Sequence, residues 1–146
     1  KLLLVGNFES DLDELPSKTH NEINRNQNII HVGFKLDVRP YFAISNALVF
    51  PSYREGFPNV VMQAGAMNLP SIVSDINGCN EIISDGINGL IIPVKNEIAI
   101  QEAMIKIQNT EVFEAMKHQS RSKILAKYEQ EKVWNAILSE YRKFEK

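Results

Sequence analysis

The sequence predicts an α/β fold: a Rossmann-like parallel sheet with helices on both faces, followed by a helical C-terminal tail. Two observations predict it. Short apolar runs of four or five residues alternate with longer segments of helical pattern, which is typical of βαβ units and a doubly wound sheet. From residue 97 onward only helical patterns remain, which predicts the tail.

Five strands are expected. Residues 2–5 are apolar throughout and are closed by Gly6 and Asn7, the profile of a strand that is buried on both faces. The other strands are expected at residues 29–32, 47–50, 71–74 and 89–93.

Helices are expected over residues 11–25, 37–46, 59–67, 98–108, 112–127 and 130–144, with a short one that ends at Ile83. Pro40 falls in the first turn of the second helix, where its missing N–H is tolerated. Because ligands bind at the C-terminal ends of the strands in such folds, the loops after Val32, Phe50 and Ser74 are expected to matter.

The composition limits the class of protein. A chain of 146 residues with 44% apolar and 23% charged residues is one ordinary soluble domain. Its net charge of -2 gives no general reason to bind nucleic acid. The single cysteine, Cys79, excludes an internal disulfide and a CxxC site, and the expected compartment is the reducing cytoplasm. Lys1 leads directly into the first strand without a preceding Met, so we expect a fragment of a longer protein.

The loop after the third expected strand, residues 51–59, carries the chemistry. Gly56 lets the backbone approach a ligand closely, and Pro58 suits the first turn of the helix that follows. The free N–H groups of that turn, together with the helix dipole, favour an anion such as a diphosphate.

An acceptor stands at each end of this segment. Eight residues separate Glu55 from Gln63, and a fully helical path of that length would rise roughly 12 Å. That is about the span from a sugar ring, across a diphosphate, to a ribose. Glu55 would then hold sugar hydroxyls, and Gln63 would hold ribose hydroxyls.

A structural interpretation stays open beside the functional one. Val60, Val61 and Ala64 are what any helix that covers a sheet would show, and the small residues 64–66 would also allow close packing. Glu55 alone could complement the dipole of the helix.

The order of several motifs resembles the retaining enzymes of glycosyltransferase family 4. The first motif is Pro51-Ser52-x-x-Glu55-Gly56-Phe57-Pro58, which continues to Ala64-x-Ala66-x-x-x-Pro70, and the second is Asn77-Gly78-x-x-Glu81-Ile82-Ile83-x-x-Gly86-x-x-Gly89. The resemblance covers residues 2–93. It implies one half of a GT-B fold, in which two Rossmann-like domains face a cleft and the C-terminal domain binds the sugar nucleotide.

The resemblance also implies roles for single residues. Glu55 matches the first glutamate of the family's Glu-x7-Glu motif, which contacts the donor sugar near the reacting centre. Gly56, Phe57, Pro58 and Asn59 match the stretch whose amides meet the sugar hydroxyls and the phosphate. Gly33 and Phe34 match the turn beside the nucleobase. Gln63 departs from the pattern, because the family has a glutamate there to hold the ribose; a glutamine still accepts a hydroxyl hydrogen bond without the charge-assisted component.

The resemblance further implies a domain that is incomplete by itself. The family's phosphate-binding Arg and Lys, in the first βα unit, and its acceptor-binding N-terminal domain lie upstream of residue 2. We therefore expect residues 1–146 to be a single nucleotide-sugar-binding domain that binds a UDP- or GDP-sugar weakly and transfers nothing. The family needs no metal ion or other cofactor, and its acceptors are glycans or lipid-linked sugars. A peripheral contact with the inner face of the cell membrane stays open.

Two other functions stay open. One is a non-catalytic nucleotide-sugar-binding module, which the departure at Gln63 favours slightly, and the other is one half of a sugar-nucleotide epimerase. Beyond the motifs, His31 is expected to pack or to form a hydrogen bond rather than bind a ligand, and Glu81 to serve a helix start. Cys79 is expected to be a bystander in a loop, and Arg54 to be solvated.

Overall fold

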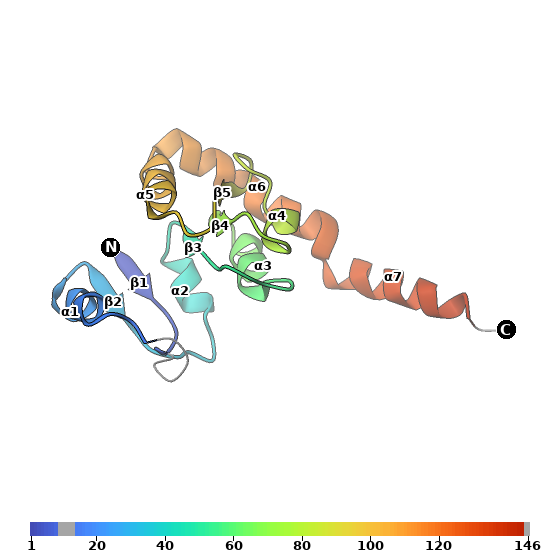
Figure 1. Cartoon of the computed structure of the whole chain (residues 1–146). Coiled ribbons are helices and arrows are strands. Elements are labelled where there is room, and N and C mark those ends of the chain that lie inside the picture. Colours follow the sequence, from blue (N-terminus) through green and yellow to red (C-terminus); the bar gives the residue numbers. More distant parts are fainter. Residues whose placement is uncertain (9–13, 145–146) are drawn as a thin grey trace. The chain divides into compact units, whose positions relative to one another are not determined.

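The computed structural model describes residues 1–8 and 14–144 and divides into two compact units, Lys1–Pro40 and Tyr41–Lys146. In both units the strands run parallel, so the α/β class with a parallel sheet and a helical tail is confirmed (Figure 1). The described strands form two hydrogen-bonded sheets, one of two strands and one of three.

The first unit is one βαβ unit. It consists of β1 (Leu2–Leu4), α1 (Ser17–Arg25) and β2 (Ile29–His31). The two strands pair in parallel with Leu2 opposite Ile29 and Leu4 opposite His31. The predicted helix begins later than expected, because Pro16 occupies the position before its first residue; residues 11–13 of that prediction lie outside the described residues.

The prediction that residues 2–5 are buried on both faces is wrong for the structure described. Leu2 is 37% exposed and Val5 is 40% exposed, whereas Leu3 and Leu4 are half-buried. The physical reason is that a sheet of two strands covers little area, and α1 contacts β2. An apolar run alone does not predict whether helices cover one face or both faces of the strand.

The second unit contains the larger sheet. Helix α2 (Arg39–Ala43), shorter than predicted, spans the boundary between the units. The unit then runs through β3 (Leu48–Phe50), α3 (Asn59–Ala66), β4 (Ser71–Ser74), α4 (Cys79–Ile82), β5 (Gly89–Ile92), α5 (Glu97–Lys106), α6 (Thr110–Tyr128) and α7 (Gln130–Arg142). The strand order is β3-β4-β5, with Leu48 opposite Ser71 and Ser71 opposite Gly89. The predicted strands and helices of this unit are confirmed to within a few residues.

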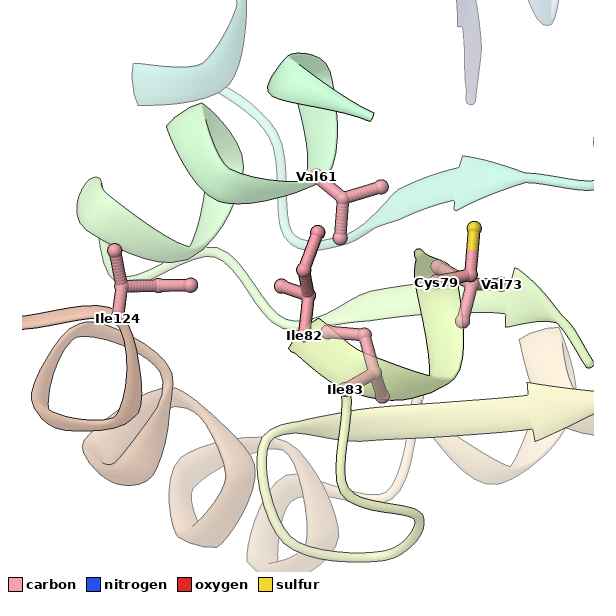
Figure 2. Packing of buried hydrophobic residues seen from close by; sticks show 6 residues of the cluster. All are labelled: Val61, Val73, Cys79, Ile82, Ile83 and Ile124. Carbon is pink, nitrogen blue, oxygen red and sulfur yellow. The ribbon is translucent and has the colours of Figure 1, made fainter. Parts of the chain in front are cut away.

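The central strand β4 separates two hydrophobic clusters, because successive side chains of a strand point to opposite faces. Val73 belongs to a cluster with residues of α3, α4 and α6, which Figure 2 shows from close by. Ile72 belongs to a second cluster with residues of β5, α5 and α6. Helices therefore cover both faces of this sheet, as the sequence predicts.

Helix α6 packs against α3. Ile124 of α6 lies in the first cluster, and a Cβ on Gly65 of α3 would lie only 2.7 Å from the Ile124 side chain. The small residue Gly65 thus permits close helix packing, which confirms the structural interpretation of residues 64–66. Asn109 caps the start of α6 by accepting hydrogen bonds from the N–H groups of Glu111 and Val112. Helix α7 follows α6 and contains no buried residue.

The close pairing of β4 and β5 gives a stability prediction. A Cβ on Gly89 would collide with the backbone oxygen of Ser71 and would press on Ile83. We expect Gly89→Ala to lower the free energy of unfolding by about 1–3 kcal/mol, because neither neighbour can move freely. Urea unfolding followed by circular dichroism measures this change.

Gly56→Ala is the matched control. A Cβ there meets no atom within 4 Å, so we expect its free energy of unfolding to stay within about 0.5 kcal/mol of the parent chain. Equal stability of the Gly89→Ala chain and the parent would contradict the described register.

Candidate functional site

The loop between β3 and α3 holds the carboxylate that the sequence singles out. The Ser52 hydroxyl donates a hydrogen bond of 2.7 Å to Oε1 of Glu55, and both residues are partly buried. The hydroxyl fixes one carboxylate oxygen and leaves the other free to accept a further hydrogen bond. Ser52 is therefore a member of this site to which the sequence pattern assigned no role.

The segment that follows Glu55 is open to solvent. No protein atom lies within 4 Å of a Cβ placed on Gly56, and Phe57 is 40% exposed. Pro58 is buried and precedes the first residue of α3, and it makes no side-chain cap. The N–H groups of Val61 and Met62 donate to the Pro58 oxygen. This leaves the N–H groups of Asn59 and Val60, at the start of α3, to face the end at which the loop arrives.

Helix α3 presents two polar side chains to solvent. Asn59 and Gln63 are both exposed and lie four residues apart in one helix, hence on the same face. The path from Glu55 to Gln63 is helical only from Asn59 onward. The assumption of a fully helical path over this segment is therefore wrong, because Pro58 and Gly56 favour a loop before the helix starts.

The loop after β4 supports the loop after β3. Gly78 has a φ of 78°, and a Cβ there would collide with the backbone oxygen of Gly56 and lie 2.9 Å from Cδ of Pro58. Only a glycine combines this φ with such a close approach. The two loops therefore pack directly on each other at the C-terminal edge of the sheet.

Glu81 serves the start of α4, as the sequence predicts. Its Oε1 accepts a hydrogen bond of 3.3 Å from the N–H of Gly78, the residue before the helix. Gly78 has no side chain that could complete the reciprocal half of a capping box. The carboxylate of Glu81 is therefore committed to holding Gly78 in place.

Cys79 lies in the first turn of α4, which corrects its expected place in a loop. The thiol is fully buried and belongs to the cluster of Figure 2. Burial, followed by the negative charge of Glu55, raises the pKa of this thiol to about 11.

Tyr128, the last residue of α6, contacts the loop after β3 and the backbone of α4. Its ring meets the ring of Phe57 in an edge-to-face arrangement, with centroids 5.3 Å apart and an interplanar angle of 66°. Its hydroxyl donates a hydrogen bond of 2.9 Å to the backbone oxygen of Glu81. Burial, and then the charge of Glu81, raises the pKa of Tyr128, so the hydroxyl keeps its proton and remains a donor. Sequence reasoning missed this residue, because no local pattern links it to a loop 71 positions earlier.

The turn at Gly33 and Phe34 belongs to the first unit. Gly33 has a φ of 68° and accepts a hydrogen bond from the N–H of Gly6, while the N–H of Phe34 donates to Oδ1 of Asn7. The ring of Phe34 is 67% exposed. His31 donates through Nε2 to the oxygen of Gly6 at 2.7 Å, which agrees with its interpretation as a hydrogen-bonding residue.

The loop after β3 contributes one carboxylate, Glu55, and one guanidinium, Arg54. Across residues 1–8 and 14–144, no group of three His, Cys, Asp or Glu side chains could hold a metal ion. Lys95, which follows β5, lies 5.2 Å over the ring of Tyr53 in the loop after β3. Arg54 is exposed, as expected. The roles of the predicted site residues in binding stay predictions.

The comparison with protein families decides the kind of protein. The family model "Glycosyl transferases group 1" matches residues 1–110. The chain belongs to this family. Most of the match falls on the part of the chain that contains both packed loops.

Two curated relatives show what kinds of protein resemble this glycosyltransferase domain. The capsular polysaccharide biosynthesis glycosyltransferase CapM of Staphylococcus aureus is 28% identical over 145 residues, which is 99% of this chain and 38% of CapM. The UDP-Gal:alpha-D-GlcNAc-diphosphoundecaprenol alpha-1,3-galactosyltransferase of Escherichia coli is 26% identical over 84% of this chain and 32% of that protein. The chain thus spans about two fifths or less of the length of these relatives.

A solved structure has the same fold. The crystal structure of Anabaena Alr3699/HepE in complex with UDP superposes with a TM-score of 0.86 at 17% identity, over 97% of this chain and 40% of that one. The likeness places the glycosyltransferase domain among GT-B structures. Within the described residues, the helices are too short or too polar to cross a membrane.

The environment of Cys79 gives a prediction on thiol reactivity. Because the reactive species is the thiolate and the raised pKa keeps Cys79 protonated, we expect almost no reaction of the native chain with a disulfide reagent at about pH 8. The chain unfolded in urea regains an ordinary thiol pKa and should react with one equivalent. Absorbance of the released thiolate measures both rates, and fast stoichiometric labelling of the native chain would contradict the burial of Cys79.

Proposed function

We propose that this chain is the donor-binding domain of a retaining glycosyltransferase of family 4, which moves a sugar from a UDP- or GDP-sugar to a glycan or lipid-linked acceptor. The observation that carries the proposal is the loop after β3. There a carboxylate held by Ser52 stands next to the open space at Gly56 and before the uncapped start of α3. A site for a sugar nucleotide needs an acceptor for the sugar hydroxyls, space in which the ligand can approach the backbone closely, and hydrogen-bond donors for the diphosphate. The loop after β3 offers these three features in that order along the chain.

The proposed chemistry is electrostatic. The first-turn N–H groups of α3 would stabilise the departing diphosphate, with Gly56, Phe57, Pro58 and Asn59 shaping the approach. Glu55 would hold sugar hydroxyls and steady the sugar as positive charge develops at its anomeric carbon. The two-carboxylate geometry of glycoside hydrolases does not apply to this mechanism.

The remaining contacts of the donor follow the family resemblance. Gln63 would hold the ribose through one accepted and one donated hydrogen bond, and the turn at Gly33 and Phe34 would lie beside the nucleobase. No metal ion takes part in the proposed transfer. The acceptor would be held by a further domain of the protein, so the chain alone would bind donor and transfer nothing.

The names of the relatives support the proposed acceptor class. CapM is named for capsular polysaccharide biosynthesis, and the E. coli relative is named for a diphosphoundecaprenol-linked acceptor.

The neutral Gln63 favours a second candidate, a non-catalytic module that binds a nucleotide sugar. The carboxylate held at Glu55 favours the transferase. Retention is tested on the full-length protein by the anomeric coupling constant of its product.

Calorimetric titration of the chain with UDP-glucose, UDP, GDP-mannose and GDP tests the donor site. We expect binding that is selective for one base. Glu55→Gln should weaken sugar-nucleotide binding about 10-fold, because the hydrogen bonds from the sugar hydroxyls lose their charge-assisted component. Glu102→Gln, an exposed residue of α5, is the matched control and should leave the affinity unchanged. Equal affinities of the parent and Glu55→Gln chains would contradict the role of Glu55.

The role of Gln63 is tested with the nucleotide itself. Gln63→Ala should weaken binding of the preferred nucleoside diphosphate about fivefold or more, because both neutral hydrogen bonds of the side-chain amide are lost. Gln63→Glu should strengthen binding through charge assistance. Gln101→Ala on α5 is the control. If neither change at Gln63 alters the affinity, the ribose does not lie there.

Gly56→Ala separates binding from folding. The added methyl group fills space that contains no protein atom, so it should leave stability unchanged but weaken sugar-nucleotide binding by obstructing the backbone approach. Unchanged affinity would contradict the proposal that the ligand occupies this space. Failure of the folded chain to bind any of the four ligands would contradict donor binding by this domain alone.

A further inference from the structure

The internal hydrogen bonds described for the loop after β3 all come from the Ser52 hydroxyl. The other contacts described for the loop are the packing of Gly78 on the Gly56 oxygen, the contact of Phe57 with Tyr128, and the approach of Lys95 to the Tyr53 ring. These three contacts depend on residues outside the loop. The elements that hold these outside residues in place therefore also hold the loop in place.

Helix α6 provides a rigid base for Tyr128. Ile124, one turn earlier on the same face, is buried in the cluster under α3. Ser120 is fully buried and donates from its hydroxyl to the Met116 oxygen at 2.9 Å. At the end of the helix, Nζ of Lys132 donates to the Leu125 oxygen at 3.1 Å. Tyr128 thus stands at the end of a helix that the core holds in place.

Tyr128 reaches the loop by two routes. The direct route is the edge-to-face contact with Phe57, an arrangement that stabilises aromatic pairs beyond the area they bury. The indirect route runs from the Tyr128 hydroxyl to the backbone of Glu81, whose carboxylate holds the N–H of Gly78. Gly78 in turn packs on the Gly56 oxygen.

We propose that Tyr128 is a positioning residue, which holds the Glu55–Pro58 segment in the shape that binds the donor sugar. The effect of Tyr128 on sugar binding rests on the proposed function. Its contacts with Phe57 and Glu81 do not. Tyr128 touches no substrate; it acts through Phe57 and through Glu81 and Gly78. The role adds a residue far along the chain to those that shape the loop after β3.

The first test measures the free chain and needs no ligand. Backbone order parameters from ¹⁵N relaxation report the rigidity of Gly56 and Phe57. We expect values near those of rigid backbone, about 0.85, in the parent chain, and values that fall toward about 0.6 in Tyr128→Leu. Tyr128→Phe keeps the ring contact and should lie between the two. Tyr141→Leu, at a tyrosine of α7 that is 70% exposed, is the matched control and should resemble the parent.

The second test uses binding of UDP-glucose and a double-mutant cycle. Tyr128→Leu should weaken binding about 2- to 10-fold, the fold-change that corresponds to the loss of one aromatic pair. In a Glu55→Gln background the same change should cost less than about twofold, because the group being positioned has already been altered. A purely structural role would weaken binding equally in both backgrounds.

The outcomes separate the two proposals. Unchanged order parameters in Tyr128→Leu overturn the positioning role, whatever the affinities are. If Glu55→Gln leaves UDP-glucose affinity unchanged, the proposed function fails, while the order parameters still decide on Tyr128. Should Tyr128→Leu not fold, Phe57→Leu removes the same ring contact from its exposed side and must lower the order parameter of Gly56 for the positioning role to stand.

Discussion

The approach of Gly78 to the backbone oxygen of Gly56 is the contact on which the rest of the site depends. It brings the loops after β3 and β4 together without an intervening side chain, and it requires a residue that tolerates a φ of 78°. Both loops follow parallel strands and start at the same edge of the sheet. The register of β3 and β4 therefore determines how far apart the two loops start.

The hydrophobic core of the second unit positions the elements that make the contact between Gly78 and Gly56. The cluster of Figure 2 joins α3, β4, α4 and α6 around fully buried side chains such as Val61 and Val73. It fixes the helices that start at the two loops, and through Ile124 it also fixes α6. Apolar packing is non-directional, but dense packing leaves little freedom of position. The polar site is thus placed by an apolar core that contains none of its proposed binding groups.

The chemistry of the site depends on how its carboxylates are engaged. Glu55 is the only carboxylate of the loop after β3, and Ser52 engages one of its oxygens. Glu81 is occupied with Gly78, and Cys79 is buried as a neutral thiol. In the proposed function, the anionic part of a donor would be met by the backbone N–H groups at the start of α3. That arrangement suits a group whose negative charge grows as it leaves.

Patterns in the sequence predicted the class of fold, most element positions and the segment proposed to bind the donor. These properties depend on local patterns: apolar runs mark strands, Gly56 and Pro58 mark a loop that enters a helix, and Glu81 marks a helix start. The sequence did not determine the exposure of residues 2–5, because burial depends on what other elements cover a strand. Nor did it assign roles to Ser52 or Tyr128. A hydrogen bond from Ser52 to Glu55 depends on the shape of a loop, and the contact of Tyr128 with Phe57 depends on how α6 packs under α3. Only the tertiary structure decides such contacts, because they join residues that no periodicity relates.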